Sequence, residues 1–186
     1  AFMDDTRDAW WAGRQSMPYA QYMCQNNYTT EDLYLIRQSI NNVYWGYLYR
    51  DVMDLVEIIR LNTDEATRDE ASFYGPNENQ IAVARIMKAY IMQIMTDTWG
   101  DIPYSQAFDI ENFPSPAYDS QESIYADLIN ELTEASDMID VTQPAFTVGD
   151  IIYGGDASKW KKLANSVKLR VAIRMKNVPG SNWETY

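Results

Sequence analysis

The chain has 186 residues, of which 46% are hydrophobic and 23% charged, a composition typical of a globular domain and not of a disordered chain. Its 15 basic and 27 acidic side chains give a net charge of −12, which opposes binding to nucleic acids and to anionic lipid surfaces. Neutral or cationic partners, sugars and peptides among them, remain compatible with this charge.

The N-terminal part of the chain has the weakest secondary-structure pattern. Residues 2–15, with Trp10 and Trp11 adjacent, favour a helix, whereas residues 17–29 show no clear periodicity. The single cysteine, Cys24, has no partner in the chain for a disulfide. Because free cysteines are usually buried and inert, we expect Cys24 to be a small buried side chain.

A long helix is predicted from Glu31 to Leu61. Apolar residues recur there in steps of three and four, which places them on one helix face. They are Ile36, Ile40, Val43, Tyr44, Leu48, Val52, Leu55, Val56 and Ile59. Thr30 is the expected N-cap, followed by acidic residues that suit the positive end of the helix dipole.

A second helix is predicted from Asn77 to Gly100. Asn77 and Gln80 have the spacing of a capping box, and Gly100 stands in the place of a C-terminal glycine cap. The most apolar stretch, residues 84–95, is interrupted by polar side chains, so we predict no transmembrane helix. The connection that follows, residues 101–118, is rich in proline but keeps enough apolar residues to be ordered.

A third helix is predicted from Asp119 to Ile139. Asp119 and Glu122 again have the spacing of a capping box, and the apolar residues between them and Ile139 form one stripe. Residues 141–155 contain one proline and three glycines, which predicts a loop, with a short strand near residues 151–153.

A fourth helix, residues 157–176, combines an apolar face with a strongly basic one. Its seven cations are Lys159, Lys161, Lys162, Lys168, Arg170, Arg174 and Lys176. They form either a solvated face or a surface that docks on acidic helices or on an acidic segment outside this chain. Asn165 and Ser166 are expected to hydrogen-bond across a helix contact or to a loop carbonyl. The predicted fold class is all-α, a TPR-like stack of antiparallel helix pairs with long ordered loops.

Three segments, in this order and spacing, carry a family resemblance. They are residues 96–104 (TDTWGDIPY), residues 116–125 (PAYDSQESIY) and residues 150–170 (DIIYGGDASKWKKLANSVKLR). Together they resemble the SusD/RagB family of Bacteroidetes outer-membrane nutrient-binding lipoproteins. Members are more than twice as long, so residues 1–186 are expected to be a single α-helical region. It would be the TPR-containing N-terminal part, without the lipidated cysteine and the C-terminal half.

The resemblance implies a non-catalytic protein of the cell surface, anchored by lipid in the outer membrane. Such a protein captures oligosaccharides and passes them to a SusC-like TonB-dependent transporter. Peptide capture, as in RagB-like members, and a purely structural role in docking the transporter remain alternatives. No nucleic acid, cofactor or metal is expected.

The resemblance to SusD also implies an arc of aromatic side chains that stacks on sugar rings beside polar hydrogen-bonding groups. The segment that leads into the first long helix matches this composition best, and an exposed tyrosine beside Gly75 is a further candidate. The candidate ligand-binding residues are Tyr19, Tyr22, Asn26, Asn27, Tyr28, Tyr34 and Tyr74.

Catalytic alternatives are disfavoured by the residue types present. The chain has no histidine, which excludes Ser-His-Asp and Cys-His catalysis and HExxH zinc sites. Acidic residues cluster at residues 4–8, 64–70 and 97–111, but a glycosidase needs two carboxylates facing each other across a cleft. A buried, closely spaced carboxylate pair would revive an enzymatic role. A calcium site within residues 97–111 is a weaker alternative, because no regular ligand spacing is present.

Overall fold

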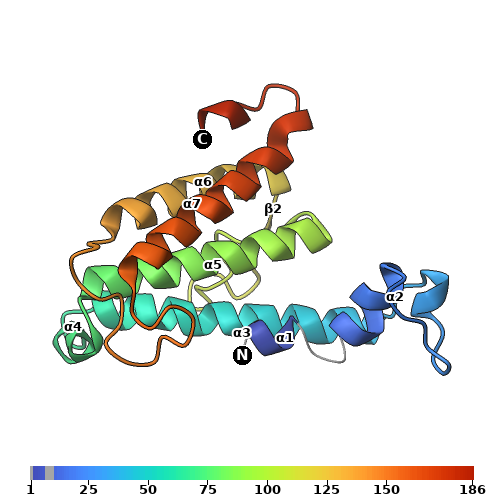
Figure 1. The fold of residues 1–186 in the computed structure, drawn as a ribbon, viewed down its shortest axis with the longest axis horizontal. Coiled ribbons are helices and arrows are strands. Elements are labelled where there is room, and N and C mark those ends of the chain that lie inside the picture. Colours follow the sequence, from blue (N-terminus) through green and yellow to red (C-terminus); the bar gives the residue numbers. More distant parts are fainter. Residues whose placement is uncertain (1, 7–10) are drawn as a thin grey trace. The chain divides into compact units, whose positions relative to one another are not determined.

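The computed structural model describes residues 2–6 and 11–186, and they form an all-α fold with long ordered loops, as the sequence predicts (Figure 1). Its longer helices are α3 (Gln38–Thr63), α5 (Asn77–Trp99), α6 (Gln121–Met138) and α7 (Ala157–Arg174). Within the described residues, the strands are β1 (Ile102–Pro103) and β2 (Tyr118–Asp119), which pair antiparallel. The chain divides into two compact units, Ala1–Met53 and Asp54–Tyr186.

The shorter elements are single turns of helix. They are α1 (Phe2–Asp5), α2 (Met17–Tyr19), α4 (Arg68–Ala71), a π-helical turn (Ala12–Ser16) and 3₁₀ turns at Glu31–Leu33, Ser72–Tyr74, Met175–Asn177 and Trp183–Thr185. No helix among the described residues is long and apolar enough to cross a membrane.

In the N-terminal unit, the predicted helix over residues 2–15 is present only in part. Helix α1 and the π-helical turn lie within it, whereas Trp10 lies outside the described residues. The long helix begins at Gln38 and not at Glu31, because Tyr34 has the left-handed conformation, φ +58°, and ends a short 3₁₀ turn. The prediction for Cys24 was also wrong, since this side chain is exposed.

In the second unit, helices α5, α6 and α7 form the packed core. Helix α5 packs along α6 and helix α6 along α7, and Figure 1 shows the three side by side. Their fully buried side chains include Ile86, Met92, Met95, Ile124, Leu128, Leu132, Val167 and Val171. Buried alanines at positions 89, 135 and 164 leave room for close approach of the helices.

The helix boundaries differ from the predicted capping boxes. Helix α5 has Pro76 at its N-cap, while the side chain of Asn77 donates to the Asn62 amide oxygen at 2.8 Å. At helix α6 the cap is Ser120, which accepts from the Ser123 backbone N–H. A hydroxyl one residue further along therefore takes the capping role predicted for Asp119. The C-terminal cap at Gly100, φ +77°, is confirmed.

The loop between α6 and α7 contains turns and no strand, so the strand predicted near residues 151–153 is wrong. The Asp150 carboxylate accepts hydrogen bonds from the backbone N–H groups of Ile152, Tyr153 and Gly155 and from the Trp160 indole. Burial alone would raise the pKa of Asp150, but these four donors hold it below its ordinary value. The hydrogen bond between Asp150 and Trp160 therefore holds the loop against α7.

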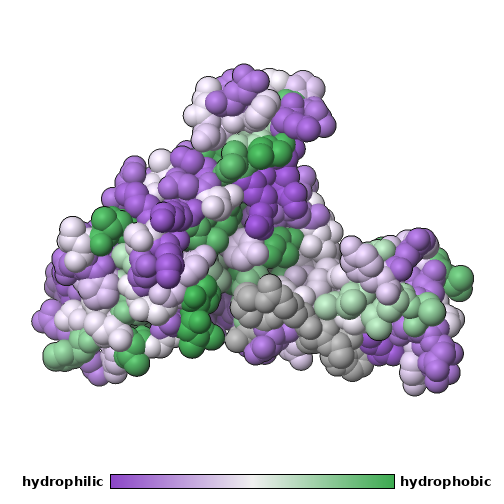
Figure 2. All heavy atoms as spheres, in the orientation of Figure 1, coloured by the Kyte–Doolittle hydropathy of each residue, from purple (hydrophilic) through white to green (hydrophobic). Residues whose placement is uncertain are grey.

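The basic face of α7 is partly engaged by its own unit. Arg174 forms an ion pair with Asp97 at 2.8 Å, and Arg170 lies over the Tyr90 ring. Asn165 and Ser166 bond to carbonyl oxygens one turn earlier in their own helix and are exposed, so the predicted cross-helix bonds are wrong. In the view of Figure 2, the surface over α6 and α7 is mostly hydrophilic.

Candidate functional site

Six of the seven candidate ligand-binding residues lie in one segment of the N-terminal unit, residues 19–36, here called the aromatic loop. Three of its tyrosines are strongly exposed: Tyr22 by 82%, Tyr28 by 67% and Tyr34 by 56%. Tyrosine rings exposed on an ordered backbone offer flat apolar faces with a polar edge. Such faces are what stacking on a sugar ring requires.

A buried ion pair anchors the aromatic loop to the start of α3. Glu31 is fully buried, and its carboxylate lies 2.5 Å from Arg37 Nε. Gln25 also donates to Glu31, and Arg37 donates to the Thr30 hydroxyl at 3.1 Å. Burial alone would raise the pKa of Glu31, but the bonds from Arg37 outweigh it and hold the pKa below its ordinary value. The buried charge pair therefore helps to fix the loop.

Tyr28 and Tyr34 have left-handed backbones, with φ of +61° and +58°. Residues other than glycine adopt this conformation rarely, and it is concentrated at functional sites. The Tyr28 ring lies 4.9 Å from the Arg14 guanidinium and 5.8 Å from that of Arg37. Both cations lie within the range of cation–π attraction and hold the ring in place.

Tyr19 and Tyr34 stack on each other with ring centroids 5.8 Å apart. The Tyr19 hydroxyl donates to the Leu35 carbonyl oxygen at 3.1 Å, and the Gln21 amide donates to the Tyr34 hydroxyl at 2.7 Å. Partial burial, and then the charge of Glu31, raise the pKa of the Tyr19 hydroxyl, which therefore stays a donor. Tyr19 supports the loop, and Tyr34 presents its ring on it.

The remaining loop candidates are free to meet a ligand. Tyr22, Asn26 and Asn27 are exposed, and their side chains form no hydrogen bond with any residue that the structure describes. Amide side chains next to exposed rings can donate and accept bonds with sugar hydroxyls. The aromatic loop thus combines ring faces with unused hydrogen-bonding groups.

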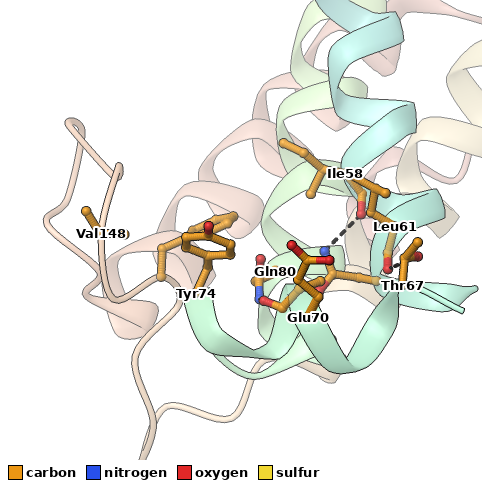
Figure 3. A pocket seen from close by; sticks show the side chains of 10 residues that line it. Ile58, Leu61, Thr67, Glu70, Tyr74, Gln80 and Val148 are labelled. Carbon is orange, nitrogen blue, oxygen red and sulfur yellow. Dashed lines mark hydrogen bonds between the residues drawn. The ribbon is translucent and has the colours of Figure 1, made fainter. Parts of the chain in front are cut away.

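Tyr74 belongs to the second unit and lines a separate pocket of about 410 Å³ (Figure 3). Ile58 and Leu61 of α3 line it together with Val148, and Figure 3 shows Gln80 between Tyr74 and Glu70. The Gln80 amide is already bonded to the carbonyl oxygens of Ala71 and Gly75. This pocket is mainly apolar, with few groups left to bond a hydroxylated ligand.

A second groove in this unit, of about 630 Å³, was not predicted as a site. It lies where the turn after β1 meets α6, and we call it the corner groove. It is lined by Val56, Ile59, Lys88, Tyr104, Ser105, Phe108, Asp109, Asp119, Ser123 and Asp127. Nothing local in the sequence shows that Tyr104, Asp119 and Asp127, which are 15 to 23 positions apart, converge on one cavity.

The carboxylates of the corner groove are held in fixed positions. Asp119 accepts from the backbone N–H groups of Tyr104 and Ser105 and from the Ser105 hydroxyl. The Tyr104 hydroxyl donates to Asp127 at 2.5 Å. Burial of Tyr104, and then this bond, raise the pKa of the Tyr104 hydroxyl. Asp109 accepts from Asn112 within its own turn. Among the described residues, no group of three or more acidic or cysteine side chains could hold a metal ion.

The chain matches a protein-family model over almost its whole length. A family model described as "Starch-binding associating with outer membrane" matches residues 3–185. The chain belongs to the SusD-like family. No curated protein matches the chain.

Solved SusD-like structures agree with this assignment. One named "Bacteroidetes AC2a SusD-like" has a TM-score of 0.75 at 26% identity, over 98% of this chain and 31% of its own. A chitin-binding protein has a TM-score of 0.74 at 30% identity, over 96% of this chain and 38% of its own. A SusD homologue from Bacteroides fragilis NCTC 9343 has 32% identity and a TM-score of 0.58, over 74% of this chain and 28% of its own. The chain thus spans about a third of the length of these proteins.

The segments that carry the SusD-like resemblance are scaffold in this structure. The bond between Asp150 and Trp160 holds the loop before α7 in place, and Gly100 ends α5. Asp119 fixes the turn at Tyr104 and Ser105 and so shapes the corner groove. The motifs that identify the family are therefore largely distinct from the aromatic loop.

Proposed function

We propose that this protein is a non-catalytic nutrient-binding protein that captures oligosaccharides through the aromatic loop. The observation that carries the proposal is the exposure of Tyr22, Tyr28 and Tyr34 on a backbone that a buried ion pair holds in place. The starch-binding description of the family and the chitin-binding neighbour support a glycan as the ligand. Stacking and a few hydrogen bonds give weak, reversible capture, which suits a protein that must release its cargo.

The SusD-like family supports the rest of the assignment. We propose that the protein is lipid-anchored at the outer membrane and hands its ligand to a SusC-like TonB-dependent transporter. The family description, which includes association with the outer membrane, supports this location. The absence of histidine leaves the chain without the commonest general base, which supports binding without catalysis.

A second role is favoured by the apolar side chains of the same loop. Leu33, Leu35 and Ile36 are 67%, 55% and 72% exposed and lie within four consecutive residues. Clustered exposed apolar residues are typical of surfaces that contact other proteins. These residues would then dock the transporter. Capture of peptides, as in RagB-like members, is a separate alternative.

The test is calorimetric titration of the chain with maltoheptaose, chitohexaose and a mixed oligopeptide panel. We expect at least one oligosaccharide to bind, and Tyr28→Ala to weaken it by roughly 1 kcal/mol, about fivefold. Tyr186→Ala, which removes an exposed tyrosine outside the loop, is the matched control and should leave binding unchanged.

Each other outcome selects a different role. Binding of peptides alone would replace the glycan with a peptide cargo. Binding of a glycan that is insensitive to Tyr22→Ala, Tyr28→Ala and Tyr34→Ala would remove the aromatic loop as its site. Loss of transporter binding on Leu33→Ser and Ile36→Ser, with glycan binding intact, would identify the apolar part of the loop as the docking surface.

A further inference from the structure

The corner groove is a cavity with the mixed lining of a small-molecule site. Its volume of about 630 Å³ lies within the roughly 300–1,000 Å³ usual for ligand pockets. One part of the wall is apolar, with Val56 and Ile59 of α3 and the rings of Tyr104 and Phe108. Ring faces and aliphatic side chains give a ligand an apolar surface to lie against.

The polar part of the lining is acidic. Asp109, Asp119 and Asp127 contribute three carboxylates, and Lys88 is the one cation among the residues that line the groove. Lys88 is already paired, with its ammonium 3.3 Å from the Glu131 carboxylate. Ser105 and Ser123 add hydroxyl groups. An unneutralised negative charge therefore faces a cavity that also has apolar walls and hydroxyls.

The carboxylates are preorganised, which matters because a ligand then need not order them. Asp119 is held by three donors and Asp127 by the Tyr104 hydroxyl. Each carboxylate keeps acceptor capacity beyond these bonds, since its two oxygens together offer about four lone-pair sites. Fixed acceptors lower the cost of binding compared with mobile side chains.

These features together select the class of ligand. A metal ion is disfavoured, because no group of three or more possible metal ligands comes together among the described residues. An anion is opposed by the charge, and a purely apolar ligand would leave the carboxylates and hydroxyls without new partners. A neutral sugar could donate its hydroxyls to the carboxylates but would leave their charge without a counter-charge.

We infer that the corner groove binds a protonated amino sugar, a hexose whose ring carries an ammonium group. The ammonium group would pair with Asp109 and Asp127, the apolar face of the ring would lie on Phe108 and Tyr104, and the hydroxyls would meet Ser105 and Ser123. This site is separate from the aromatic loop. It takes from the proposed function only that the ligand is a saccharide.

The test uses three β-1,4-linked tetrasaccharides that differ only at carbon 2: the glucosamine tetramer, its fully N-acetylated form and cellotetraose. Calorimetry at a pH where the amine is protonated should give tighter binding of the glucosamine tetramer than of the other two. Asp109→Asn and Asp127→Asn should each weaken glucosamine binding about fivefold. The matched control is Asp137→Asn, which removes an exposed charge of α6 outside the groove.

Two binding measurements and one folding control separate the amino-sugar site from non-specific attraction to an acidic protein. Raising the pH until the amine loses its proton should abolish the preference for the glucosamine tetramer. Phe108→Ala should weaken the tetramer but leave 1,4-diaminobutane, an amine without a sugar ring, unchanged. Asp109→Asn keeps the bond with Asn112, so it should leave the far-ultraviolet circular dichroism spectrum unchanged.

Specific results would overturn the inference. Equal affinity for the three tetrasaccharides would exclude recognition of the ammonium group. Binding of 1,4-diaminobutane as tight as that of the glucosamine tetramer would show that the groove selects charge alone. An equal effect of Asp137→Asn would assign the preference to net charge. Tyr28→Ala and Tyr22→Ala report on the aromatic loop, so failure of the proposed function and failure of this inference are separately visible.

Discussion

The aromatic loop and the corner groove both present tyrosine or phenylalanine rings, but one ring in each lies beside groups of opposite charge. In the loop, the guanidinium groups of Arg14 and Arg37 flank Tyr28. In the groove, Tyr104 donates its hydroxyl to the carboxylate of Asp127. The loop therefore offers ring faces backed by cations, whereas the groove offers rings beside a negative charge.

This contrast teaches that ring exposure alone does not define a ligand. A ring that already has cations beside it has little attraction left for a further cation, and its free face suits a neutral sugar. Rings beside carboxylates suit a ligand that is both apolar and positively charged. If both proposed sites bind saccharides, the loop would favour neutral ones and the groove cationic ones.

The largest expected effect comes from removing the cation that holds the aromatic loop. Arg37→Ala leaves the fully buried Glu31 carboxylate without its ion-pair partner. A buried carboxylate without its cation costs about 3 kcal/mol, more than exposed pairs contribute. Amide hydrogen exchange of residues 21–37 measures the effect locally, and we expect this segment to lose its protection.

The control for this variant is Arg60→Ala, which breaks an exposed pair with Glu57. It should leave stability within experimental error, because exposed ion pairs contribute little. Equal loss of protection in both variants would mean that the buried pair is not the anchor of the loop.

The acid dependence follows from the same pair. The pKa of Glu31 is lowered in the folded state, so its stabilising contribution is present above the unfolded pKa of about 4.5. It is lost as the pH falls through the lowered folded value. Below that range, the wild type and Arg37→Ala should be equally stable in urea titrations that use hydrogen exchange as the readout.

The corner groove should respond next most strongly, to Asp119→Ala. This change removes the carboxylate that accepts hydrogen bonds from the backbone N–H groups of Tyr104 and Ser105 and from the Ser105 hydroxyl. Part of this site is open to water, so we expect a loss of about 2 kcal/mol in the free energy of unfolding, measured by urea titration. Asp109→Asn should cost less than a quarter of that, since its own turn is retained. If Asp119→Ala left stability unchanged, the carboxylate would not be what fixes the groove.

A third, smaller effect on stability is expected from Asp51, a second buried acid of the N-terminal unit. Asp51 is buried, and one of its oxygens has no partner among the described residues. Burial, and then the charge of Asp5, raise its pKa. Asp51→Asn should therefore stabilise the protein by about 1 kcal/mol at pH 7.

The pH dependence of the Asp51→Asn variant has the opposite sign to that of Glu31. A raised folded-state pKa means that the wild type gains stability as the pH falls toward the unfolded value of 3.8. The advantage of the asparagine variant should shrink on acidification and vanish near that value. An advantage that is constant with pH would show that Asp51 is not ionised unfavourably in the folded protein.

The helices were predictable from the sequence because apolar periodicity extends over many residues, whereas their first residues were not. Ser120 and Asp119 are both good caps, and only the three-dimensional turn at Tyr104 takes Asp119 away from the helix. The start of α3 was misplaced because apolar spacing continues through Ile36, although Tyr34 breaks the helix with a positive φ. Local backbone strain leaves no periodic signal.

The two sites differ in the same way. The aromatic loop was predictable in outline, because Tyr19 to Tyr34 lie close together in sequence. The corner groove depends on Val56, Lys88, Phe108 and Asp127, which come from four separate segments. A cavity formed by tertiary packing cannot be read from spacing along the chain.

The smallest expected change in stability is also the sharpest test of function, because Tyr22 has no structural role to lose. Its side chain is 82% exposed and forms no hydrogen bond with a described residue. Tyr22→Ala should alter the free energy of unfolding by less than about 0.5 kcal/mol. If the aromatic loop binds glycans, the same change should weaken the best oligosaccharide severalfold by calorimetry, while Tyr186→Ala does not. A ring that costs nothing to remove from the fold, and yet is needed for binding, can only contribute through contact with the ligand.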